Sequence, residues 1–145
     1  MDEQQQPLPK VSVPNLTLLK VLCIFTFTGS GLGILSYGII GLLHSYFSSN
    51  LALIPDEKNR ELIEVMLSAG RLFFFLNTIL YSASFTGARL LWRMKKLGFH
   101  FYTASQLLLL ILPLLIIKGF PMPGATIFLS LLFIWGYSGF LKFMK

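Results

Sequence analysis

The chain has 145 residues, a mean hydropathy of +0.71 and a formal net charge of +6. Hydrophobic residues make up 54% of it, and its 12% of charged residues is about half of the fraction in an average soluble domain. Four apolar runs hold a single charged residue, Arg89: residues 21–43, 72–92, 101–117 and 124–141. A soluble domain of this size cannot hide four such runs from water. The composition therefore excludes a soluble globular domain, a disordered chain and a secreted disulfide scaffold. It predicts an all-α membrane protein, an antiparallel bundle of four transmembrane helices.

The N-terminal part predicts a flexible tail followed by the first span. Residues 1–15 hold three prolines and three glutamines and too few apolar side chains to fold alone. The run at 21–43 is longer than the core of a cleaved signal peptide and no A-x-A site follows it, so we interpret it as a retained signal anchor. Residues 16–145 then form the transmembrane domain. Cys23 is the only cysteine, which rules out an intrachain disulfide.

Small residues repeat along the first span and predict a face for close helix packing. Gly29 and Gly33 form a GxxxG pair, and Ser36 and Gly41 continue the pattern. Two occupants of this face are open: another helix of the same chain, or a helix of a second copy or of a partner membrane protein.

The segment between the first two runs is long enough to fold by itself. Pro55 is placed as the first helical residue, with Asp56 and Glu57 favourable at the positive end of the helix dipole. Leu62, Val65, Met66 and Ala69 recur at helical spacing. This predicts an amphipathic helix over about 55–70 in the first extracytoplasmic loop, with Gly70 as a hinge into the second span. It either lies at the outer interface and closes the bundle or docks an extracytoplasmic partner.

Polar side chains occur within the second and third spans. Asn77, Tyr81 and Ser84 share one face of the second span, and Gln106 lies in the third. Hydrogen bonds between helices are their predicted role, and a pathway lined by several copies of the chain is the alternative. Arg89 can lift its guanidinium to the head groups, with a buried functional charge as its alternative.

The distribution of Lys and Arg predicts the orientation. One side carries Lys10, Lys20, Arg89, Arg93, Lys95, Lys96, Lys142 and Lys145, and the other carries Lys58, Arg60, Arg71 and Lys118. The predicted location is the inner (plasma) membrane of the cell. With an even number of spans, the excess of basic residues on the first side places both termini in the cytoplasm. The interfacial basic residues Arg89, Arg93, Lys95 and Lys96 suit anionic lipid heads. Because the positive charge is split among several sites, it predicts no nucleic-acid partner.

Residues that would support catalysis or coupled transport do not stand out. No Asp or Glu falls within the four runs, and His44 and His100 belong to opposite faces of the bilayer. We therefore expect no enzyme activity, no catalytic residues, no cofactor and no metal.

Two stretches carry a resemblance. LKVLCIFTFTGSGLG at residues 19–33 and GARLLWRMKKLGFHFY at 87–102 resemble the first span and the second turn of a group of small, uncharacterised four-helix inner-membrane proteins of bacteria. The resemblance implies the order of the four spans. It carries no known activity that could be transferred to this chain. The sequence thus predicts a non-enzymatic accessory or assembly subunit that packs through its first helix, with a small oligomeric transporter or channel as the alternative.

Overall fold

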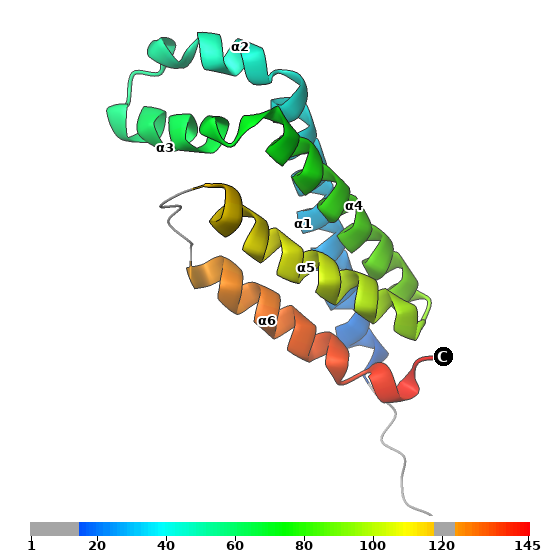
Figure 1. Cartoon of the computed structure of the whole chain (residues 1–145). Coiled ribbons are helices and arrows are strands. Elements are labelled where there is room, and N and C mark those ends of the chain that lie inside the picture. The colour runs from blue at the N-terminus through cyan, green and yellow to red at the C-terminus, as the bar shows by residue number, and fades with distance from the viewer. Residues whose placement is uncertain (1–14, 118–123) are drawn as a thin grey trace, which may run out of the picture.

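A computed structural model describes residues 15–117 and 124–145, and these residues form helices and no strand (Figure 1). The predicted tail and the turn after the third run lie largely outside them. The helices are α1 (Leu16–Leu42), α2 (His44–Ser49), α3 (Glu57–Ser68), α4 (Gly70–Trp92), α5 (Lys96–Ile116) and α6 (Gly124–Ser138), with short 3₁₀ turns η1 (Leu51–Leu53) and η2 (Leu141–Phe143). The predicted all-helical class is confirmed for this part of the chain.

Three or four of these helices are suited to crossing a membrane. The helices α1 and α5, and α6 with its continuation to Phe143, are long and apolar enough on their own. The helix α4 meets the same standard only together with α3, from which it is bent by 83°. Side chains such as Asn77 and Arg89 lower the hydropathy of α4. Its 23 residues still give about 34 Å of helix, which exceeds the hydrocarbon core of a bilayer.

The long helices run antiparallel to their neighbours. Side-chain contacts join the start of α1 to the end of α4 and the end of α1 to the start of α4, and α5 and α6 continue the alternation (Figure 1). Leu19 of α1 shares a buried cluster with Phe140 and Met144. The first and last described residues therefore lie on the same side of the molecule.

The turn between α4 and α5 is closed by the C-terminal residue. The Lys145 amide donates to the Met94 carbonyl at 2.9 Å, and the Lys96 amide donates to the Lys145 carbonyl at 2.9 Å. Met94 adopts a φ of 58°, a left-handed conformation that reverses the chain within a short turn. These two backbone bonds tie the C-terminal residue to the α4–α5 turn.

At the opposite end, α2 and α3 form a hairpin that extends sideways from the long helices (Figure 1). Asp56 caps α3 by accepting from the Lys58 amide at 3.2 Å, so α3 begins slightly after the predicted start at Pro55. The bend into α4 falls at Gly70, whose φ of 77° suits a residue without a Cβ. The sequence interpretation did not include α2 or η1. The His44 imidazole holds α2 against α3 by a 3.0 Å bond between its Nε2 atom and the Leu67 carbonyl.

Candidate functional site

A chain of hydrogen bonds crosses the middle of the molecule and joins one residue from each long helix. Ser30 of α1 donates to Ser84 Oγ of α4 at 3.1 Å. Gln106 Nε2 of α5 donates to the same Ser84 oxygen at 3.1 Å, and Ser130 Oγ of α6 donates to Gln106 Oε1 at 3.3 Å. Ser30, Ser84 and Ser130 are buried. Hydrocarbon offers polar groups no hydrogen-bond partners, so side chains that satisfy one another fix the helices in one register. We call these four residues the polar chain.

A second set of contacts between helices lies next to the polar chain, on the side of the molecule where α1 begins and the chain ends. Thr26 of α1 and Tyr137 of α6 share a hydrogen bond of 2.8 Å between their hydroxyl oxygens. The Cys23 thiol lies 3.7 Å from the Ala88 carbonyl and donates to it. The Tyr137 ring meets the Tyr102 ring of α5 edge to face, with 4.9 Å between ring centroids. This layer links α1 to α4 and α6, and α6 to α5.

The polar residues expected from sequence divide into two groups. Ser84 and Gln106 belong to the polar chain, whereas the Asn77 amide donates to the Phe73 carbonyl of its own helix at 2.8 Å. Tyr81 stacks on Tyr37 of α1, with 5.4 Å between ring centroids. Tyr81 and Gln106 line one cavity, described below, but Asn77 and Ser84 do not, so the four predicted residues do not form a single lining. Sequence reasoning missed Ser30 and Ser130, because a single serine in an apolar run gives no signal of its partner.

The predicted small residues also divide. A Cβ added at Gly33 would lie 2.5 Å from the Tyr81 ring, and one at Gly41 would lie 3.2 Å from the Phe74 Cβ, so both glycines face α4. A Cβ at Gly29 would meet nothing within 4 Å, and Ser36 is exposed. The small residues of α1 thus face two directions, one towards α4 and one towards the surroundings.

Direct contact between helix backbones lies elsewhere, at Gly87 of α4 and Gly98 of α5. A Cβ added at Gly87 would lie 2.7 Å from the Tyr102 amide nitrogen, and one at Gly98 would lie 2.6 Å from the Leu91 amide nitrogen. Backbone thus approaches backbone on both sides, which only residues without a Cβ allow.

A cavity of about 300 Å³ opens beside the polar chain, lined by residues of α1, α5 and α6 and by Tyr81 of α4. Small or polar residues of α1 and aromatic or aliphatic residues of α6 line much of it. Its wall includes Phe25, Thr26, Gly29, Ser30, Gln106, Ser130 and Phe133. The cavity gives the exposed flank of α1 an uneven, partly polar surface at the depth of the polar chain.

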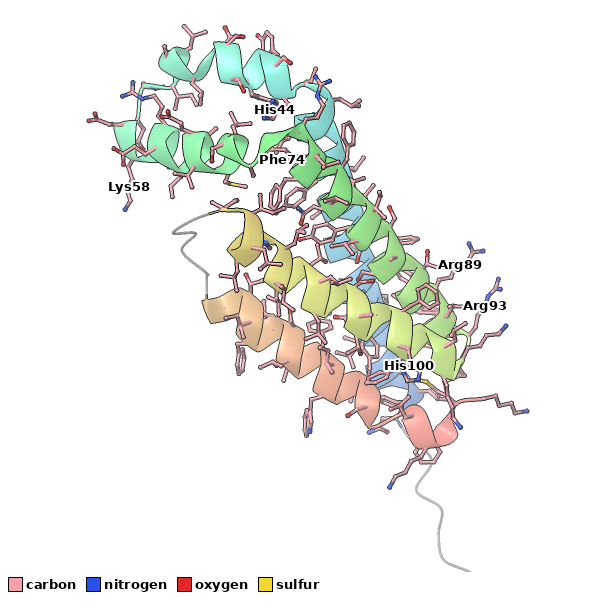
Figure 2. All side chains as sticks on the ribbon, viewed as in Figure 1. His44, Lys58, Phe74, Arg89, Arg93 and His100 are labelled. Atoms are coloured by element: carbon pink, nitrogen blue, oxygen red, sulfur yellow. The ribbon has the colours of Figure 1, made fainter. Side chains whose placement is uncertain are left out.

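The basic residues predicted for the membrane interface gather at the end of the molecule that carries the C-terminus. Arg89, Arg93, Lys95 and Lys96 are all exposed there, and Figure 2 shows the two arginines on the outer side of α4. The described acidic residues, Asp56, Glu57, Glu61 and Glu64, all belong to the α2–α3 end. His44 and His100 lie at opposite ends (Figure 2), and no group of three or more His, Cys, Asp or Glu in residues 15–117 and 124–145 could hold a metal ion.

Fold and site together define an all-helical protein with three or four helices suited to a membrane and a polar chain across them. No family model, no curated protein and no solved structure matches the chain.

The polar chain makes a measurable prediction about the coupling between α4 and α5. Ser84→Ala and Gln106→Ala each remove the bond between these two residues, so the double variant is expected to be less destabilised than the sum of the single variants. The expected coupling is about 0.6 kcal/mol, the average for interhelical hydrogen bonds in membranes. Unfolding free energies of the four proteins in mixed micelles measure it. Additive effects would mean that the 3.1 Å contact contributes nothing to stability.

Proposed function

We propose that the chain is a four-span, non-enzymatic inner-membrane protein that serves as an accessory or assembly subunit. The proposed spans are α1, α4, α5 and α6, with α2 and α3 at the outer face and both termini in the cytoplasm. The positions of the charges support this orientation: basic residues such as Arg93 and Lys96 lie with the C-terminus, and the acidic residues lie at the far end.

The assembly role is supported mainly by the side of α1 that faces away from α4, which we call its outward flank. Gly29 and Ser36 lie two turns apart on this flank, and a Cβ at Gly29 would enter open space. Small residues that none of the described helices covers allow the backbone of another helix to approach closely. The cavity beside Ser30 and Gln106 adds hydroxyl and amide groups at the same flank. A transmembrane helix of a partner protein or of a second copy fits these features.

The internal polar groups favour assembly over the channel alternative. Ser84 accepts from two helices, Asn77 is bonded to its own backbone, and Tyr81 is stacked on Tyr37. Side chains used in this way hold the helices together, which favours a packing role over a pathway lined by several copies.

Cross-linking from adjacent positions of α1 tests the proposal. In a Cys23→Ser background, Ser36→Cys places a thiol on the proposed flank, and Leu35→Cys places one at nearly the same depth about 100° around the helix. Leu35 is 61% exposed, so it reports on contacts with bulk lipid. We expect copper-catalysed dimers from residue 36 if a second copy binds. If another protein binds, we expect adducts from a benzophenone side chain at residue 36. Neither product is expected from residue 35.

Gly29→Ile supplies the matched interface variant. It adds bulk where the structure has room, so the chain should still fold while cross-linking from residue 36 falls at least severalfold. Gly33→Ile would not separate the two effects, because its side chain would strike Tyr81 within the chain. Equal products from residues 35 and 36, or none from 36, would contradict the assembly role. Solute flux through liposomes that hold the purified chain alone would instead support the channel.

A further inference from the structure

A groove at the basic end of the molecule combines aromatic walls with two cations. Phe27 of α1 and Phe85, Arg89, Trp92 and Arg93 of α4 line a cavity of about 580 Å³. The Phe27 ring lies 4.9 Å from the Phe85 ring and 6.2 Å from the Trp92 ring, between centroids. The three rings form a continuous apolar floor between α1 and α4.

Arg89 and Arg93 stand on one edge of this floor. They are one helical turn apart, both are exposed, and their side chains point outwards in the same direction in Figure 2. The one ion pair among the described residues joins Arg60 to Glu57 near the far end of the molecule. Neither guanidinium group at the groove therefore forms an ion pair with a carboxylate of the described residues.

The chemistry of the groove matches one class of ligand. Guanidinium groups bind phosphate oxygens through paired, charge-assisted hydrogen bonds, and basic pockets between transmembrane helices bind the head groups of anionic lipids. Trp92 is suited to the level of the head groups, and Phe27 and Phe85 continue the groove towards the middle of the helices. A small soluble anion would use only the cationic edge, whereas a phospholipid uses the edge and the floor together.

We propose that this groove binds one phospholipid with a negatively charged head group. Its phosphate lies between Arg89 and Arg93, and an acyl chain packs over Phe27 and Phe85. This goes beyond the proposed assembly role and uses a different surface, since the assembly flank is at Gly29 and Ser36.

Native mass spectrometry of the full chain in mild detergent tests the selectivity. With phosphatidylglycerol and phosphatidylcholine offered in equal amounts, we expect phosphatidylglycerol adducts to dominate. R89Q/R93Q removes both charges, keeps stems of similar polarity, and should weaken phosphatidylglycerol binding by about tenfold or more. K95Q/K96Q removes the same net charge from the adjacent turn, outside the groove, and should weaken phosphatidylglycerol binding much less than R89Q/R93Q does. Equal binding of the two lipids, or equal losses in both variants, would overturn the proposal.

Tryptophan quenching supplies a readout in a bilayer. The chain has two tryptophans, so Trp135→Phe leaves Trp92 as the only indole. In vesicles of equal composition, phosphatidylglycerol with brominated acyl chains should quench Trp92 more than brominated phosphatidylcholine does. R89K/R93K keeps the charge and should keep this preference, and R89Q/R93Q should abolish it. Equal quenching by the two brominated lipids in the otherwise unchanged chain would overturn the proposal even if the glutamine variant fails to fold.

Discussion

Gly98→Ala is expected to destabilise the chain by about 3 kcal/mol, although it adds a single methyl group. The new Cβ would lie 2.6 Å from the Leu91 amide nitrogen and 2.7 Å from the Gly87 carbonyl oxygen. Both atoms belong to the backbone of α4, so no side-chain rotation relieves the clash and the two helices must separate. Separation also weakens the bond from Gln106 to Ser84, since it spans the same pair of helices.

The measurement is thermal unfolding of the purified chain in detergent, followed by size-exclusion chromatography after heating. A loss of about 3 kcal/mol corresponds to a fall in Tm of about 10 °C for a chain of this length. Gly31→Ala is the matched control, because a Cβ there would meet nothing within 4 Å. It should leave Tm unchanged or raise it slightly, since alanine is a better helix former than glycine. A Tm for Gly98→Ala equal to that of the control would show that α4 and α5 are not in close contact.

The sequence was sufficient to predict the elements whose signal is local. The apolar runs predicted the long helices, and the spacing of Leu62, Val65 and Met66 predicted α3, because each pattern is contained in one segment. The helices α1 and α5 begin earlier than their apolar runs, since they include Lys20 and Lys96, whose long side chains can reach water from the end of an apolar helix. Residues 44–53 have no comparable periodicity, so α2 and η1 were not foreseen.

Features that depend on the register between helices were beyond the sequence. Gly29 and Gly33 formed the motif that drew attention, yet direct contact between helix backbones is at Gly87 and Gly98, one on each side of the α4–α5 turn. Gly87 lies five residues before the last residue of α4 and Gly98 two residues after the first residue of α5, so their positions along the sequence do not signal the contact. Ser84 and Gln106 were identified as polar residues, but the link to Ser130 requires the position of α6. The bend before α4 falls at Gly70, the hinge that the sequence predicted, but its angle of 83° could not be predicted from the sequence.

Tyr137→Ala is expected to release α6 from the other helices. The Tyr137 side chain is fully buried, its ring packs edge to face on Tyr102, and its hydroxyl bonds to Thr26. No other α6 side chain among the described residues is as deeply buried. Replacing it by alanine should destabilise the fold by about 4 kcal/mol, as for other large aromatic residues in well-packed cores. Tyr137→Phe keeps the ring and loses the hydroxyl bond, at an expected cost of about 1 kcal/mol.

Cys23 provides a built-in reporter for this release. It is the only cysteine, it is fully buried, and it lies in the same cluster as Tyr137. In Tyr137→Ala, its reaction with a membrane-permeable maleimide should become severalfold faster, because the thiol loses the ring that covers it. Trp135→Ala is the control on the same helix: Trp135 is 75% exposed, so its loss should leave Cys23 protected. Continued protection in Tyr137→Ala would mean that the bond from Ser130 to Gln106 is enough to hold α6 in place. The anchor of the helix would then be the polar chain and not the aromatic layer.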